Sequence, residues 1–211
     1  MWLSEMNNLS IETGVTERNR RPFFIVLGLF FLPLVLAFAV YYGSNWRPSG
    51  TTNKGDLINP AISLPLVKLL TSEGEITNDR FLRGDWSLVY LGDGSCDQPC
   101  RDALFSMRQA FQLLGKDMTR IKRVFLYAGN ITDPAFFLAQ HTDLMKVNID
   151  AAAGHQLLEV FPDDKGVPAL KSGKIYIVDP LGNLMMAYIP DTDPRNIYQD
   201  LKKLLSLSHI G

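Results

Sequence analysis

The sequence has no marked excess of charge, and it lacks several common functional motifs. Its 21 basic and 22 acidic residues give a formal net charge of −1. The chain therefore has no electrostatic footprint for a polyanion, and nucleic acid is not an expected partner. We find no internal repeat, no phosphate-binding loop and no serine nucleophile elbow. Two cysteines and three histidines, far apart in sequence, make a weak case for a four-ligand zinc site.

Apolar residues make up 46% of the chain, and they are unevenly distributed. Between Phe23 and Tyr42 every residue except Gly28 and Pro33 is apolar, and none is charged. A helix of this length spans roughly 30 Å, the thickness of the hydrocarbon core of a bilayer. Residues 23–42 are therefore predicted to form a transmembrane helix. The remaining apolar residues suffice for one ordinary core, which excludes a disordered chain.

The charges that flank this segment predict its orientation. Three arginines precede it closely and only two basic residues follow it closely: Arg18, Arg20 and Arg21, then Arg47 and Lys54. Positive charge favours the cytoplasmic side, so residues 1–22 are expected in the cytoplasm of a bacterium and the rest in the periplasm. The alternative is a cleaved signal peptide, because Ala37-Phe38-Ala39 has the form of a cleavage site. In both cases the main domain crosses the inner membrane into a compartment where disulfides persist.

The remaining sequence divides into a linker and one folded domain. Residues 43–59 are rich in turn formers and are predicted to be a tether, so the domain is expected over 60–211. Period-two and period-3.6 patterns alternate along the domain. Strands are expected at 86–91, 123–128, 144–149, 174–178 and 184–189, a short hairpin at 66–77, and helices at 103–114, 133–141, 155–161 and from 193 onward. This order predicts an α/β fold, a mixed sheet with helices on both faces.

The cysteines, Cys96 and Cys100, lie where a predicted buried strand passes into a helix. A spacing of four residues places both sulfurs on one side of the helix N-terminus, whose dipole favours thiolate over thiol. A thiolate is the nucleophile of disulfide exchange and also a soft ligand for Cu(I) or Zn(II). The alternative is a static disulfide, although a bridge that closes so small a loop stabilises little by restricting the unfolded chain.

The stretch from Trp86 to Cys100, which ends in Ser-Cys-Asp-Gln-Pro-Cys, resembles the Sco/SenC family of membrane-anchored, thioredoxin-fold proteins. Residues 69–86 are similar to that family's opening hairpin and strand, and residues 176–184 to its late hairpin. The single N-terminal membrane helix also fits. The resemblance covers roughly residues 60–205, and it implies a thioredoxin-like fold for the domain.

Proteins of that family assist assembly of the copper centre of cytochrome c oxidase, either by binding copper through two cysteines and a distal histidine or by reducing thiols of the oxidase subunit. The cysteines carry over onto Cys96 and Cys100, but the position of the histidine, counted back from Gly182, is Lys171. A protonated lysine does not bind copper. Near the cysteines it would instead lower the pKa of a thiol. By the same hairpin count, Gly173 occupies the place of the cis-proline of related thioredoxin folds.

Three hypotheses follow. In the first, the chain is a periplasmic thiol-disulfide exchange protein whose client is a cytochrome c oxidase subunit or another thiol protein. Cys96, taken as the more exposed thiol, attacks, and Cys100 resolves the mixed disulfide. In the second, Cys96 and Cys100 bind Cu(I) as a chaperone, with a further ligand from a histidine, a methionine or the client. In the third, the chain is an assembly scaffold with a structural disulfide. The candidate further ligands are His141, His155, Met185 and Met186.

Overall fold

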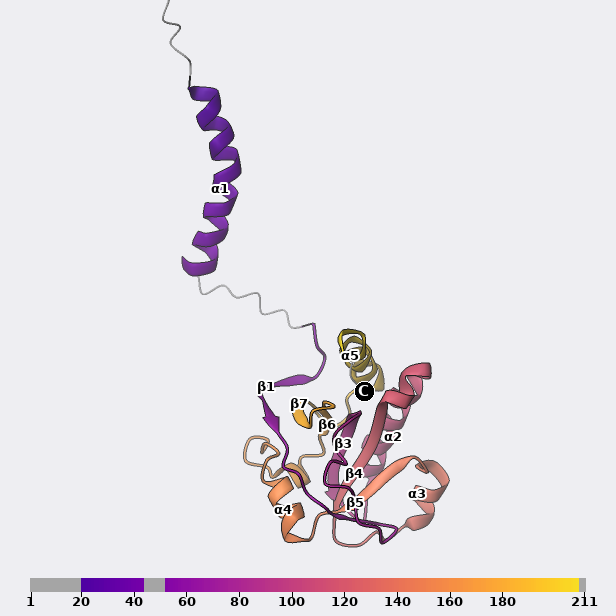
Figure 1. The fold of residues 1–211 in the computed structure, drawn as a ribbon. Coiled ribbons are helices and arrows are strands. Elements are labelled where there is room, and N and C mark those ends of the chain that lie inside the picture. The colour runs from indigo at the N-terminus through magenta and orange to yellow at the C-terminus, as the bar shows by residue number, and fades with distance from the viewer. Residues whose placement is uncertain (1–19, 44–51, 209–211) are drawn as a thin grey trace, which may run out of the picture. The chain divides into compact units, whose positions relative to one another are not determined.

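The computed structural model describes residues 20–43 and 52–208 (Figure 1). These ranges belong to two separate compact units, of which the second begins at Thr51. The first contains α1, Arg21–Gly43, a helix with Pro33 inside it and no buried residue. This helix is long and apolar enough to cross a membrane, which confirms the helix predicted over residues 23–42. Its orientation stays a prediction, and residues 1–19 lie outside the described part of the chain.

The second unit is built on a seven-stranded mixed sheet with the strand order β1-β7-β6-β3-β4-β5-β2. Strands β3, β4 and β5 are parallel to one another, and the other pairings are antiparallel. The strands are β1 Asp56–Ser63, β2 Leu70–Thr71, β3 Trp86–Asp93, β4 Ile121–Ala128, β5 Leu144–Asn148, β6 Ile175–Val178 and β7 Asn183–Tyr188. The predicted late hairpin is confirmed as β6 and β7.

Helices cover both faces of this sheet (Figure 1). One face packs against α2, α3 and α5, and the other packs against α4 and the segment that precedes β3. The helices are α2 Gln98–Leu113, α3 Pro134–Gln140, α4 Ala152–Leu158 and α5 Pro194–Leu207, and the 3₁₀ helices are η1 Gly115–Arg120 and η2 Ala169–Lys171. The predicted α/β class is confirmed.

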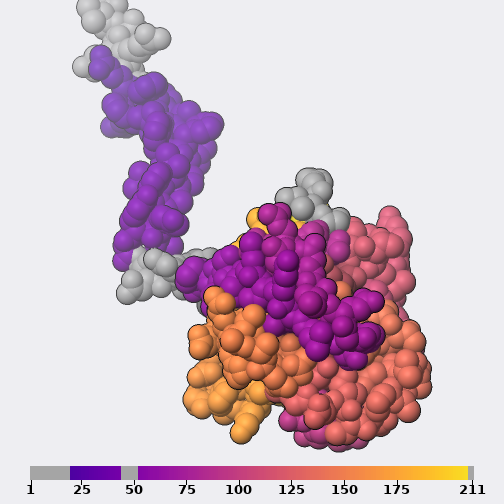
Figure 2. All heavy atoms as spheres, turned by 60° about the horizontal axis from the view of Figure 1, so that its bottom comes forward, coloured from indigo at the N-terminus to yellow at the C-terminus, as the bar shows by residue number. Residues whose placement is uncertain are grey.

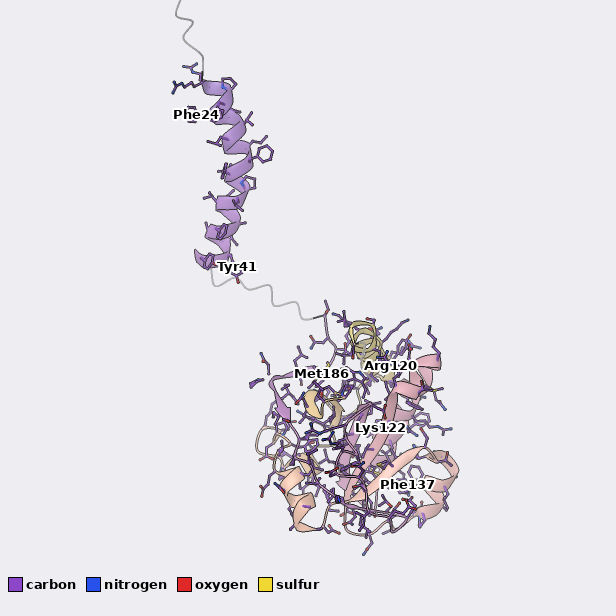
Figure 3. All side chains as sticks on the ribbon, viewed as in Figure 1. Phe24, Tyr41, Arg120, Lys122, Phe137 and Met186 are labelled. Carbon is purple, nitrogen blue, oxygen red and sulfur yellow. A yellow bond between two sulfur atoms is a disulfide. The ribbon has the colours of Figure 1, made fainter. Side chains whose placement is uncertain are left out.

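The burial of strand β3 on both faces explains why the sheet lies at the centre of the domain. Leu88 and Tyr90 pack with the α2 side, whereas Val89 and Leu91 pack with the α4 side. Each is at most 4% exposed, so β3 is buried on both faces, as a central strand must be. Met186 of β7, labelled in Figure 3, belongs to the α2-side cluster and is 1% exposed.

The structure differs from the sequence prediction at the start of the domain. Strand β1 begins at Asp56 and pairs with β7, so the described domain starts before residue 60 and the tether is shorter than residues 43–59. The carboxylate of buried Asp200 holds this segment, because it accepts hydrogen bonds from the backbone amides of Lys54 (2.8 Å) and Gly55 (2.9 Å). The turn-forming composition of residues 43–59 predicted a linker. Composition alone does not reveal that part of this segment pairs with β7, a strand far along the chain.

The predicted first hairpin is only partly present. Its turn closes between Thr71 and Glu75, and Leu70 bridges Ile76, but residues 66–69 are not a strand. The side chains of Val67 and Leu69 pack onto the α4 face of the sheet instead of joining a ladder. Burial of these side chains therefore decides the path of the segment.

A buried charged group lies at the start of β4 and β5. The Arg123 side chain, which is fully buried, forms an ion pair with Asp143 and approaches Nδ1 of His141 to 3.4 Å. His141 is also buried, against the rings of Phe136 and Phe137. Desolvation, followed by the positive charges of Arg123 and Arg108, lowers the pKa of His141 to about 4. The imidazole is therefore neutral in the folded protein near pH 7.

We expect acid to destabilise the domain through His141. The unfolded chain takes up a proton on this residue below pH ~6.5 and the folded chain only below about 4. The free energy of unfolding should therefore fall as the pH is lowered through that window, by about 3 kcal/mol at its acid end. Urea titrations of residues 51–211 at several pH values measure this dependence. His141→Gln should flatten it, and His155→Gln, at an exposed position of α4, should not. An unchanged slope in His141→Gln would contradict the assignment.

Candidate functional site

The two cysteines lie at the junction between β3 and α2. The turn after β3 is closed by the Cys96 amide, which donates to the carbonyl of Asp93 (3.0 Å), and by the Ser95 amide, which donates to the carboxylate of Asp93 (2.8 Å). Asp97 then caps α2, because its carboxylate accepts a hydrogen bond from the amide of Cys100 (3.2 Å). Cys100 is thus fixed in the first turn of a helix, and Cys96 lies in the turn that precedes it, as the sequence predicts.

Cys96 and Cys100 form a disulfide, with their Cα atoms 5.1 Å apart. Cys96 is 2% exposed and Cys100 is 3% exposed, and both belong to the apolar cluster beneath α2. The expectation that Cys96 is the more exposed of the two is therefore wrong. Cys96 adopts a left-handed backbone conformation (φ 42°) in the turn, and its bonded sulfur packs into this cluster. An attack by Cys96 therefore requires movement of the turn.

Arg101 ties this turn to α3. Its Nε donates to the carbonyl of Cys96 (3.2 Å), and its Nη2 forms an ion pair with Asp133 (2.8 Å), the residue that caps α3. The guanidinium also lies 4.4 Å from the centre of the Phe136 ring. The position of Cys96 therefore depends on a side chain that follows Cys100 directly in the sequence.

A cavity of about 240 Å³ opens beside Cys100. Lys171, at the end of η2, and Gly173 line it on one side, and residues of β3 and the turn line it on the other. The structure thus brings Lys171 to the cysteine site, as the hairpin count predicts. Gly173 has a positive φ of 65°, and a Cβ atom there would lie 3.1 Å from Pro190. At this position, therefore, no side chain covers the backbone of the cavity wall.

The charges around the cavity have opposing effects on a thiolate. Asp93 and Asp97 line the cavity and disfavour a further negative charge, whereas Lys171 and the N-terminus of α2 favour it.

Hydrogen bonds from Ser95 lower the pKa of Asp93, so its carboxyl is ionised at neutral pH. Burial and the charge of Asp97 raise the pKa of Tyr90 to about 12, so its hydroxyl stays protonated in the cavity. Lys171 is the one cationic side chain among the lining residues.

The other candidate copper ligands do not line this cavity. His141 is buried beside Arg123. The side chain of His155, on α4, is exposed, and its Nε2 lies 3.2 Å from the carbonyl of Asp150. Met186 is buried in the cluster that contains the cysteines, and Met185 is partly buried against it. Within residues 20–43 and 52–208, no three His, Cys, Asp or Glu side chains form a group that suits a metal ion.

Two residues of the site were not predicted from the sequence. Tyr90 had a usable signal, because the alternation along β3 places it with Leu88 on the face that α2 covers. Arg101 had none, because its partner Asp133 is 32 positions further along the chain.

Comparisons with known proteins agree with this architecture. The profile of a family described as transmembrane-like, thioredoxin-like, C-terminal domain matches residues 86–208. A SCO2-like protein from Rickettsia felis is 25% identical over 150 residues, which cover 64% of this chain and 73% of that protein.

Solved structures of Sco proteins have the same fold. Bradyrhizobium japonicum ScoI with copper bound aligns with a TM-score of 0.52 and 21% identity, over 68% of this chain and 99% of that one. Yeast Sco1 with copper bound aligns with a TM-score of 0.60 and 14% identity, over 72% and 96%. The resemblance to Sco proteins and the thioredoxin-like fold are thereby confirmed. At these identities the structural likeness concerns the fold alone.

We expect Lys171 to lower the pKa of the Cys100 thiol in the reduced protein, because both residues line the same cavity. A nearby cation stabilises a thiolate, so Lys171→Met should raise this pKa, by about one unit. The pH dependence of alkylation by iodoacetamide measures this value. Lys116→Met, at an exposed position in η1 after α2, is the matched control. Equal pKa values in the native chain and in Lys171→Met would show that Lys171 does not act on the thiols.

Proposed function

Because the chain belongs to the transmembrane-like, thioredoxin-like C-terminal domain family and resembles Sco proteins, we propose that it is a membrane-anchored protein that exchanges disulfides with a client during assembly of cytochrome c oxidase. The observation that carries this proposal is the position of the Cys96–Cys100 disulfide at a helix N-terminus, next to a cavity that contains Lys171. A lysine in place of a histidine favours thiolate chemistry over copper binding.

The exchange conserves atoms and electrons as follows. In the reduced protein the thiolate of Cys96 attacks one sulfur of a client disulfide, and the other client sulfur leaves as a thiolate. The thiolate of Cys100 then attacks the sulfur of Cys96 and releases the second client thiolate. The client has gained two electrons, the pair has become the observed disulfide, and an external dithiol must reduce it before another cycle.

The assignment of roles follows from how each cysteine is held. Cys100 is fixed in α2 by the Asp97 cap, whereas Cys96 belongs to a turn that can move when Arg101 releases its carbonyl. Cys96 is therefore the proposed attacking residue, and Cys100 the resolving one. The proposed location is the periplasmic side of a bacterial inner membrane, with α1 as the anchor and residues 1–22 in the cytoplasm.

Cu(I) delivery is the second candidate function, because ScoI and Sco1 proteins with the same fold have been solved with copper bound. In this chain Cys96 and Cys100 would supply two sulfur ligands after reduction, and a third would have to come from the client or from a rearranged side chain. Lys171 stands at the sequence position where the resemblance places the third ligand, and it lines the cavity beside Cys100.

We expect Cys100→Ser to accumulate mixed disulfides with the client, since Cys96 still attacks but nothing resolves the product. Cells that express this variant should yield covalent complexes that a reductant dissolves, and mass spectrometry identifies the partner. Cys96→Ser should give far fewer complexes. A Cys100→Ser variant that captures no more than the double variant Cys96→Ser, Cys100→Ser would exclude the exchange mechanism.

We also expect Lys171→His to gain Cu(I) affinity. The substitution places an imidazole in the cavity beside Cys100, and a third ligand should raise affinity about tenfold or more, which is about 1.4 kcal/mol. Competition with a chromophoric Cu(I) chelator measures this gain in the reduced full-length chain, with Lys116→His as the control. Tight binding of one equivalent by the native chain, with no gain in Lys171→His, would favour copper delivery over thiol exchange.

A further inference from the structure

A second and larger cavity lies on the same side of the sheet as α2 and α3. It has a volume of about 500 Å³ and is bounded by α3, by the ends of β4 and β5, and by β2 with the turn that follows it. Figure 2 shows the magenta segment that contains β2 next to the orange-red segment that contains α3. Its volume is in the range of ligand-binding pockets, roughly 300–1,000 Å³. The cysteines do not line it.

Apolar side chains form part of the walls of this cavity, beside polar ones such as Thr71 and Asn148. Phe137 of α3, labelled in Figure 3, and Pro134 lie on one side, and Leu70 of β2 lies on the other. Two of the lining leucines are exposed, Leu70 at 51% and Leu138 at 72%. Apolar side chains that border a pocket and remain in water are typical of a surface that a partner covers.

The charges at the cavity favour an uncharged occupant. Its charged lining side chains are Glu73 and Lys146, which form an ion pair with each other at 2.8 Å. Burial acts to raise the pKa of Glu73, but the hydrogen bonds from Lys146 and Ser72 outweigh it and lower this pKa to about 2. Both groups are thus charged and mutually neutralised at neutral pH. A ligand with a charge of its own would meet no unpaired opposite charge among the lining residues, whereas an apolar side chain would contact Leu70, Phe137 and Leu138.

The loop between β4 and α3 joins this cavity to the disulfide. One side of this loop, residues 129–131, lines the cavity. Its other side contacts the cysteine turn, since the amide of Thr132 donates to the carbonyl of Gly94 (3.4 Å) and a Cβ on Gly94 would lie 2.6 Å from the backbone of Asn130. Both sites also lie where the parallel strands β3, β4 and β5 end. A polypeptide bound at the disulfide can therefore continue across this loop into the cavity.

We propose that this cavity binds a large apolar side chain of the client, in the stretch of polypeptide that flanks the client's reactive cysteine. This inference rests on the proposed function and adds the chemistry by which the client is recognised. Burial of one aromatic side chain in the cavity should accelerate the reaction of a matching client about tenfold or more at limiting concentration.

The test uses the reduced full-length chain in detergent and short blocked peptides with one cysteine, carried as a mixed disulfide with thionitrobenzoate. Attack by the chain on the cysteine sulfur releases thionitrobenzoate, which is followed by its absorbance. The peptides are made in pairs that differ only in having Phe or Ser at one position. Successive pairs place that position at different distances from the cysteine. The test variant is Leu138→Glu, and the control is Leu207→Glu, which changes a leucine of α5 with the same 72% exposure.

We expect the native chain and Leu207→Glu to react with at least one Phe peptide about tenfold faster than with its Ser counterpart, through a lower KM. Leu138→Glu should lose this preference and keep the native rate with the Ser peptide, which shows that the variant is folded. No preference for Phe at any position, or a preference that persists in Leu138→Glu, would overturn the inference. Failure of the native chain to release thionitrobenzoate from any peptide would instead overturn the proposed function.

Discussion

The site depends on the parallel pairing of β3 with β4 at the centre of the sheet. The eight residues from Trp86 to Asp93 pair in register with those from Ile121 to Ala128, and β3 is buried from Trp86 to Gly92. A shift by one residue would move every side chain of this strand to the opposite face and disrupt the packing on both faces, so the point where it ends is fixed. The turn at that point and the Asp97 cap then determine where α2 starts, and with it the place of both cysteines.

This arrangement is compatible with both functions proposed above, thiol exchange and Cu(I) delivery. The strand-to-helix junction holds two sulfurs together in both cases, and the loop that contains η2 and Gly173 supplies what faces them. In this chain that loop contributes Lys171, a point charge that stabilises an anion and does not ligate a soft metal while protonated. The burial of both sulfurs in an apolar cluster opposes a thiolate, so reduction should move the cysteine turn toward the cavity.

Much of the fold could be predicted from the sequence, because burial on a strand or helix leaves a periodic pattern. The apolar run in residues 86–91 and the helical spacing of apolar residues in 103–114 are local signals, and the structure confirms the strand and the helix that they predict. The parts that were missed depend on contacts between distant segments. Strand β1 is held by β7 and Asp200, the cysteine turn by Arg101, and the larger cavity by the approach of β2 to α3.

Cys96 was expected to be exposed because position in a turn usually implies exposure, but its sulfur is bonded to Cys100 and packs beneath α2.

The central claim is that Cys96 and Cys100 form an exchangeable redox pair and not a static bridge. The most direct measurement is the reduction potential of the pair, obtained by equilibrating the full-length chain with defined ratios of reduced and oxidised glutathione and counting free thiols. The account predicts a potential above about −300 mV, within reach of biological thiols. A potential below that value, with the disulfide intact at every practical ratio, would mean that the bridge is structural and that exchange is not the function of this site.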